Sequence, residues 1–176
     1  MNNAININEL KRHFKVDEDT IFRILKRFSD KHKVKALHKH ENSIYTSQEY
    51  FDMIINEENA VANELIPIDD IINSASDKMS INSTNIIYFL INSNELVYIG
   101  QTTKALSRIG EHQYNSDKIF NKIFYIDVPQ HKLDQVEMSY IITYNPPKNI
   151  TGTEAHTKLE FLVDRVLERV KSEGDM

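Results

Sequence analysis

The sequence predicts an α+β protein, and two observations carry that prediction. Three short runs between residues 85 and 128 are rich in β-branched and aromatic side chains and are bounded by turn signals, as strands are. Elsewhere apolar residues recur at the spacing of amphipathic helices. The 176 residues suffice for one compact domain or two small ones. We therefore expect a helical N-terminal part, followed by a three-stranded antiparallel sheet flanked by helices.

The first segment is expected to form two short helices joined by a tight turn. Asn6 with Glu9 three residues later matches a capping box, and Asp17 can cap a second helix. Only Lys15 and Val16 separate the two. The apolar residues that would pack the pair together are Leu10, Phe14, Val16, Ile21, Ile24 and Leu25. This pattern resembles a helix-turn-helix, with Lys11 and Lys15 replacing the small residue and the glycine usual there.

Two β-like runs follow the helix pair, at residues 34–38 and 43–46, around the turn signal Glu41-Asn42. Such a hairpin would form a wing beside the helices. Thr46 with Glu49 then matches a second capping box that opens another helix. We interpret residues 1–58 as a winged helix-turn-helix-like DNA-binding domain. A helix pair with a purely structural role is the alternative.

Charge is distributed unevenly along the chain. The net charge is −5 overall, but residues 1–40 carry ten Lys and Arg against five Asp and Glu, a net of +5. Residues 41–80 have a net of −8. A basic cluster of this kind is typical of a phosphate-backbone binder, although a solvated helix face is the simpler interpretation. The candidate DNA-binding residues are Phe22, Arg23, Lys26, Arg27, Lys31, Lys33, Lys35 and Lys39.

Residues 59–84 are acidic, rich in Asn and Ser, and broken at Pro67, which predicts a linker containing one short helix. Two strands are expected next, at residues 85–91 and 95–100, and a third at 122–128. Helices are expected near 104–114 and 132–144. A last helix begins near Thr153, and we expect it to pack on the α+β domain of residues 85–176; a dimer seam is the alternative.

Several polar residues lie on these predicted strands and helices in positions that could form one catalytic site. Tyr88 and Tyr98 lie on adjacent strands and can point to one sheet face, while Arg108 and His112, four apart, share one side of a helix. A buried, unpaired carboxylate is costly without a cation or donor, so Glu137, which sits within the apolar face of the later helix, is hard to explain as structure alone. The candidate site residues are Tyr88, Tyr98, Arg108, His112, Glu137 and Asn149.

These residues resemble the GIY-YIG nuclease family. Ile86-Ile87-Tyr88 stands at the GIY element, with Ile86 where glycine is usual, and Tyr98-Ile99-Gly100 matches the YIG element. Arg108 and His112 follow at the family's spacing, and Glu137 and Asn149 match its distal pair. The resemblance covers about residues 85–150.

The resemblance implies hydrolysis of phosphodiester bonds in double-stranded DNA. Glu137 would hold one divalent cation, Mg²⁺ or Mn²⁺, and Arg108 would bind the scissile phosphate. Tyr88 or Tyr98 would act as general base, with Tyr88 favoured. His112 would orient that base, and Asn149 would support a tyrosine or the glutamate.

The sequence therefore predicts a metal-dependent endonuclease of the homing, phage or mobile-element type, targeted by its N-terminal domain. The 15 Lys against 6 Arg are compatible with an A/T-rich genome. No apolar run is long enough for a membrane span, and cysteine is absent, so we expect a cytoplasmic protein, in a bacterial host if phage-encoded. It would be a monomer or weak dimer. The runner-up is a catalytically inactive DNA-binding regulator, and an RNA-directed enzyme ranks below it.

Overall fold

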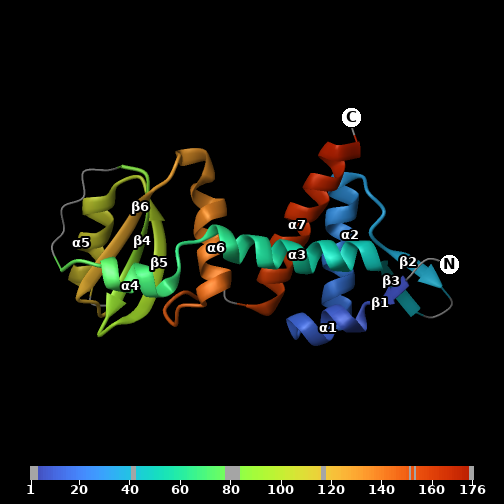
Figure 1. Ribbon diagram of the computed structural model, residues 1–176, viewed down its shortest axis with the longest axis horizontal. Coiled ribbons are helices and arrows are strands. Elements are labelled where there is room, and N and C mark those ends of the chain that lie inside the picture. The colour runs from blue at the N-terminus through green and yellow to red at the C-terminus, as the bar shows by residue number, and fades with distance from the viewer. Residues whose placement is uncertain are drawn as a thin grey trace. The chain divides into compact units, whose positions relative to one another are not determined.

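The computed structural model describes residues 4–40, 43–77, 84–115, 118–150, 152 and 154–174. The chain divides into two compact units, one formed by Met1–Asn63 with Glu154–Met176 and the other by Glu64–Thr153. Figure 1 shows the elements of each unit. In the part of the chain that is described, no helix is both long and apolar enough to cross a membrane.

Where it is described, the first unit combines four helices with a small antiparallel sheet, in which the strands follow the order β1-β3-β2. Its elements are β1 (Ala4–Asn6), α1 (Asn8–Phe14), α2 (Glu18–His32), β2 (His38–His40), β3 (Ser43–Ser47), α3 (Gln48–Glu64) and α7 (Ala155–Gly174).

The predicted helix pair is present, with differences at its ends. Asp17 caps α2, since its carboxylate accepts a hydrogen bond from the Thr20 backbone N–H at 2.9 Å. The capping box at Asn6 is wrong, because Asn6 lies in β1 and α1 starts after Ile7 without a side-chain cap. Lys15, in the turn, adopts a left-handed conformation (φ 55°), the backbone for which glycine is usual.

The hairpin predicted at residues 34–46 is shifted along the sequence. The run 34–38 pairs only from His38 onward, because the chain first passes Ala36 through the core, where the Ala36 carbonyl accepts a hydrogen bond from Thr46 Oγ1 at 3.0 Å. Thr46 is therefore not a helix cap; the Ser47 hydroxyl accepts from the Tyr50 N–H instead. The turn at Glu41-Asn42 lies outside the described residues.

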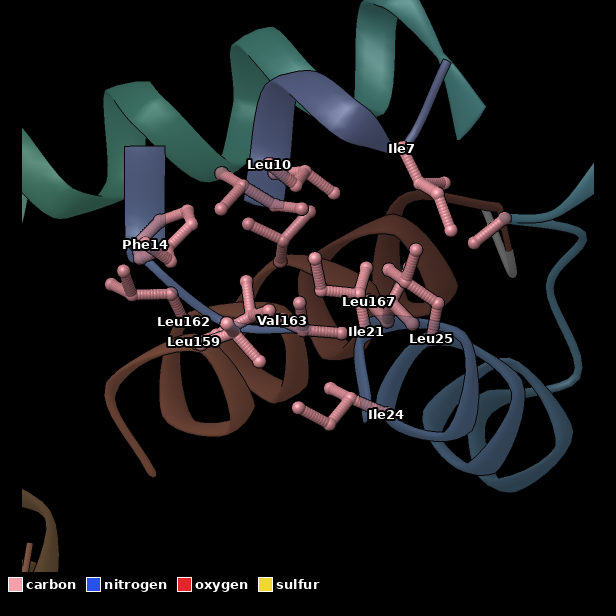
Figure 2. Close-up of a cluster of buried hydrophobic side chains, with 14 of the residues drawn as sticks. Ile7, Leu10, Phe14, Ile21, Ile24, Leu25, Leu159, Leu162, Val163 and Leu167 are labelled. Carbon is pink, nitrogen blue, oxygen red and sulfur yellow. The ribbon is translucent and has the colours of Figure 1, made fainter. Parts of the chain in front are cut away.

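The prediction that the C-terminal helix packs on the α+β domain is wrong. Its apolar stripe lies in the core of the first unit, and Figure 2 shows the side chains of α7 facing those of α1 and α2. An amphipathic stripe predicts that a helix will be packed, but it carries no information about the partner. The α7 residues buried in this core are Leu159, Leu162, Val163, Val166 and Leu167.

A buried ion-pair network also fastens α7 to α3. The Glu57 side chain has no exposed surface, and its carboxylate accepts from Arg165 Nε at 2.5 Å and from Arg169 Nη2. The neighbouring Glu58 binds Lys158 and His13 and keeps 24% of its side chain exposed. Charge pairing thus adds to apolar packing in this core.

Replacing Glu57 with alanine is expected to destabilise the first unit by about 2–4 kcal/mol, because the partly buried Arg165 loses its counter-ion. The matched change Glu58→Ala breaks more exposed pairs and is expected to cost about 0–1 kcal/mol. Urea unfolding followed by circular dichroism measures both. Equal losses in the two variants would contradict a structural role for the buried pair.

The second unit is a three-stranded antiparallel sheet with helices on both faces, as predicted (Figure 1). Helix α5 covers one face, and α4 and α6 pack with the other. The strand order is β5-β4-β6, so β5 is an edge strand. The described elements are α4 (Ile68–Ser74), β4 (Ile86–Asn92), β5 (Glu95–Thr102), α5 (Ala105–Asn115), β6 (Lys122–Asp127), the 3₁₀ turn η1 (Gln130–Lys132) and α6 (Leu133–Tyr144).

The predicted turn between the first two strands of this sheet is present. Ser93 and Asn94 both have positive φ (50° and 65°), the geometry of a tight hairpin turn. Helix α6 ends where Asn145 turns left-handed (φ 48°), just before the two prolines.

The interval 59–84, predicted as an acidic linker, is structured where it is described. Helix α3 continues to Glu64. The next residues pack into the core of the second unit through the buried Ile71 of α4, with Leu65 and Ile68 around it. Residues 78–83 lie outside the described part. The predicted short helix is present as α4, and its apolar residues are sufficient for packing.

Candidate active site

Two tyrosines lie side by side on the sheet face that α5 covers. Tyr88 on β4 stands opposite Gly100 on β5, and Tyr98 comes two residues before that glycine on the same face. Their ring centroids are 6.0 Å apart. A Cβ on Gly100 would lie 2.7 Å from Tyr98 Cε1 and closer still to the Tyr88 ring. Glycine is therefore required here so that the two rings can cover the strand.

His112 completes this cluster from α5. The residues of α5 that face the sheet are Ala105, Ile109 and His112, and their spacing explains why the histidine is buried at 3% exposure. His112 Nε2 lies 2.9 Å from Tyr88 Oη. The imidazole also meets the Tyr98 ring edge to face, with centroids 5.3 Å apart. Tyr88, Tyr98 and His112 thus form one contiguous group.

Arg108 lies at the exposed side of the same group. Its guanidinium donates to Glu111 Oε2 at 3.0 Å, and this bond is the main cause that raises the pKa of Arg108. The two tyrosine oxygens add to that increase. Because about half of the Arg108 side chain is exposed, its planar donor fork remains accessible to an anionic ligand.

Burial raises the pKa of Tyr88 well above its ordinary value of about 10, and the neighbouring Tyr98 raises it further. The guanidinium of Arg108 acts in the opposite direction. In this structure the Tyr88 phenol is therefore protonated at neutral pH. The phenolate form of Tyr88 would be stabilised by the donors already placed at its oxygen, His112 Nε2 and the Arg108 guanidinium.

Lys118 belongs to this cluster, although the sequence pattern did not indicate it. Its ammonium lies 3.4 Å from His112 Nδ1 and stands over the Tyr98 ring, 4.5 Å from the centroid. An ammonium only donates hydrogen bonds, so this contact favours an unprotonated Nδ1 and a proton on Nε2. His112 Nε2 then donates to Tyr88 Oη. Lys118 follows α5 in an irregular segment, where no helical or strand spacing marks it.

Glu137 is placed on the opposite face of the sheet from the tyrosines. It projects from α6, is half-buried, and accepts a hydrogen bond from Gln101 Nε2 at 3.0 Å. The same amide donates to Asp134 Oδ1 at 2.5 Å. Burial raises the pKa of Glu137, and Asp134 raises it further, while the Gln101 amide opposes both. Because Gln101 directly follows Gly100, the tyrosine cluster and the pair Glu137–Asp134 flank the same stretch of the edge strand β5.

Asn149 has a structural contact that the sequence did not specify. Its side-chain amide donates to the Ile99 carbonyl at 2.8 Å and accepts from the Ile99 N–H at 2.9 Å. The adjacent Lys148 N–H donates to the Val97 carbonyl. Together these bonds hold the segment 148–149 against the open edge of β5. Asn149 therefore fixes the backbone between Tyr98 and Gly100. Its support of a tyrosine or of Glu137 stays a prediction.

The oxygen donors beside β5 fit a hard divalent cation. Glu137 and Asp134 are two carboxylates that share one neutral amide donor. A cation would stabilise the charged form of Glu137, whose pKa is raised by burial and, to a lesser degree, by Asp134. Among the described residues there is no group of three or more His, Asp or Glu side chains that could hold a metal. Water and substrate oxygens would therefore complete the coordination.

The predicted DNA-binding residues lie mainly on α2 and just after it. The side chains of Arg23, Lys26, Arg27, Lys31, Lys33 and Lys35 are exposed, and Phe22 is half-buried. Arg27 and Lys31 form ion pairs with Glu160 and Asp164 of α7. The Lys39 side chain lies outside the described residues.

Paired phenols, an arginine, a histidine and carboxylates that can hold a cation are groups that phosphodiester hydrolysis can use. The fold and the site thus define the second unit as a nuclease-type domain.

Residues 84–162 match the family model of the GIY-YIG catalytic domain, so the chain contains a GIY-YIG domain, as the resemblance predicted. The match extends into the first turns of α7. No curated protein and no solved structure matches the chain. The domain makes DNA the implied substrate and hydrolysis the implied reaction class, and GIY-YIG nucleases generally use a divalent metal.

Proposed function

We propose that the protein is a DNA endonuclease in which the GIY-YIG domain hydrolyses a phosphodiester bond with one divalent metal and the first unit brings that domain to DNA. The observation that carries the proposal is the contact between Tyr88 Oη and His112 Nε2, with Tyr98 and Arg108 beside it, inside the segment that matches the family. A role for these residues only in packing would not require so many polar groups on one face.

In the proposed reaction Arg108 binds the scissile phosphate, where its delocalised charge counts most as negative charge builds up. Tyr88 acts as the phenolate, which His112 Nε2 stabilises by donating to its oxygen, and accepts the proton of the attacking water. The water oxygen bonds to phosphorus and displaces the alkoxide of the cleaved strand, which takes a proton from solvent. Glu137, assisted by Asp134, would hold the divalent metal, which when bound would neutralise charge and activate water. Asn149 keeps the strand between the two clusters in place.

Tyr98 is the second candidate for the base because it is half-buried, whereas Tyr88 has no exposed surface. Water reaches Tyr98 more readily in the unbound protein. Tyr88 has the better set of donors around its oxygen. The two single phenylalanine variants separate these assignments.

Targeting by the first unit is supported by its helix pair, its small antiparallel sheet and the exposed basic side chains of α2. This arrangement suits a winged helix-turn-helix module that reads the major groove with α2. A role in homing, in a phage or in a mobile element follows from the pairing of a small nuclease with a separate binding module. The proposed partner is double-stranded DNA.

The direct test is incubation of supercoiled plasmid containing the target with the full chain and Mg²⁺, and in parallel with EDTA. We expect nicked or linear product with Mg²⁺ and none with EDTA. Binding of the plasmid without cutting in both conditions would identify an inactive regulator and refute the nuclease proposal.

Replacing Lys118 with methionine is expected to slow cutting at neutral pH about tenfold, the cost of losing one hydrogen bond to a charged oxygen. Without the ammonium, His112 is free to move its proton from Nε2 to Nδ1 and no longer stabilises the Tyr88 phenolate. Lys118→Arg keeps the cation and is expected to restore most of the rate. Single-turnover rates across pH 6–9 measure the effect.

Lys122→Met is the matched control, because Lys122 binds Asn94 in the hairpin turn instead of the tyrosine cluster. If Lys118→Met and Lys122→Met give the same pH–rate profile as the unmodified chain, Lys118 does not position His112.

A further inference from the structure

A cleft of about 540 Å³ lies between α2 and α7 in the first unit. Its walls are formed by Thr20, Arg23, Ile24, Arg27, His156 and Glu160. Three of these six side chains are basic, and one is acidic. The apolar Ile24, which belongs to the core shown in Figure 2, forms part of the wall.

The Arg23 guanidinium donates its hydrogen bonds to uncharged acceptors. Its Nη2 donates to Thr20 Oγ1 at 2.9 Å, and its Nε donates to the Asp19 carbonyl at 3.4 Å. Asp17 lies near enough for Arg23 to contribute to its lowered pKa, but that carboxylate is bound chiefly to Thr20 as the helix cap. The hydrogen bonds of Arg23 thus orient the guanidinium without neutralising it.

Arg27, on the same helix, is held by an acid of α7. Its Nη2 lies 2.8 Å from Glu160 Oε1, and one turn further on Lys31 Nζ lies 2.6 Å from Asp164 Oδ1. Glu160 and Asp164 are four residues apart, as are Arg27 and Lys31. A row of carboxylates on α7 therefore faces a row of bases on α2. At the cleft, the Glu160 carboxylate shows where an anionic oxygen can bind Arg27.

We propose that this cleft binds a backbone phosphate of DNA through Arg23, Arg27 and His156. In the absence of DNA the Glu160 carboxylate pairs with Arg27, and the phosphate takes the place of that carboxylate on binding. The inference rests on the proposed targeting role of the first unit and extends it to α7, which the sequence did not associate with DNA. Guanidinium groups bind phosphate in the same planar fashion as carboxylate, so the exchange keeps the geometry.

The exchange is feasible because the pair to be broken is exposed. The Arg27 and Glu160 side chains keep 58% and 30% of their surface accessible, and ion pairs of this kind contribute little stability. Phosphate contacts also release counter-ions from DNA, which favours the exchange at low salt. Glu160 thus lowers the affinity for DNA without preventing binding, and its removal is expected to tighten binding.

The test is fluorescence anisotropy of a labelled 30-base-pair duplex of mixed sequence with the full chain in EDTA, which prevents cutting. Glu160→Gln is expected to tighten binding about two- to fivefold, the effect of one exposed ion pair. The matched control Glu168→Gln removes the same charge from an exposed position of α7 away from the cleft, and is expected to change affinity less. Circular dichroism confirms folding of each variant.

Arg23→Ala and His156→Ala are expected to weaken binding, and Arg23→Ala to lower the slope of log affinity against log salt by about one. If Glu160→Gln and Glu168→Gln have equal effects, or if Arg23→Ala and His156→Ala bind as the unmodified chain does, the cleft proposal is wrong while targeting by the first unit stands. If the unmodified chain does not bind the duplex, the targeting proposal fails as well.

Discussion

The change from Glu137 to glutamine is expected to abolish DNA cutting and leave DNA binding intact. Glutamine keeps the size of the side chain and can still bond to Gln101, but it removes the charge that would hold the divalent cation. Loss of such electrostatic stabilisation costs on the order of 10²–10³ in rate or more. Cutting is measured as conversion of supercoiled plasmid with Mg²⁺, and binding as a mobility shift in EDTA.

The control for this change is Asp127→Asn, which removes the same charge from an exposed position at the end of β6 in the same unit. Asp127→Asn is expected to cut at the rate of the unmodified chain. If Glu137→Gln cuts plasmid as fast as Asp127→Asn does, Glu137 does not carry the metal. Loss of both cutting and binding in Glu137→Gln would instead contradict the division of labour between the two units.

The second large effect is expected from Tyr88→Phe, which removes the proposed base without altering the ring that packs over Gly100. General base catalysis contributes about 10²–10⁴ in rate, so a loss in that range is expected. The pH dependence follows from the raised pKa of Tyr88. The active form is the phenolate, and the pKa lies above the working range, so the rate should rise about tenfold per pH unit between pH 7 and 9.

Single-turnover cutting across that pH range tests the assignment, with Tyr114→Phe as control, because Tyr114 is 89% exposed on α5 and lies outside the cluster. Tyr88→Phe should lose both rate and slope. If Tyr98→Phe loses them while Tyr88→Phe keeps them, Tyr98 is the base. A rate that is independent of pH in the unmodified chain would exclude both tyrosines.

The local elements of the second unit could be predicted because each depends on neighbours in the sequence. The strand alternation placed Tyr88 and Tyr98 on one face, and the helical spacing placed Arg108 and His112 together. Because successive residues of a strand point to opposite faces, Gln101 lies on the face opposite Gly100, where Glu137 and Asp134 are found. The carboxylate cluster was therefore partly accessible from sequence, although Asp134 and Gln101 were missed.

Long-range contacts could not be predicted in the same way. The apolar stripe of α7 fits any complementary core, and the ion pairs that bind it to α3, such as Glu57 with Arg165, join residues 108 positions apart. Lys118 reaches His112 from an irregular segment, and Asn149 acts through hydrogen bonds to the backbone at Ile99. None of these contacts has a fixed sequence spacing. They arise from packing of elements that are distant in the chain.

The central claim is that the tyrosine cluster and Glu137, on either side of β5, act on one phosphodiester bond. A crystal structure of Tyr88→Phe with duplex DNA and Mn²⁺, with the metal located by its anomalous signal, tests this most directly. The account predicts one Mn²⁺ bound by Glu137 at about 2.0–2.2 Å, and a backbone phosphate that contacts both the ion and Arg108. Mn²⁺ bound away from Glu137, or a phosphate out of reach of Arg108, would contradict it.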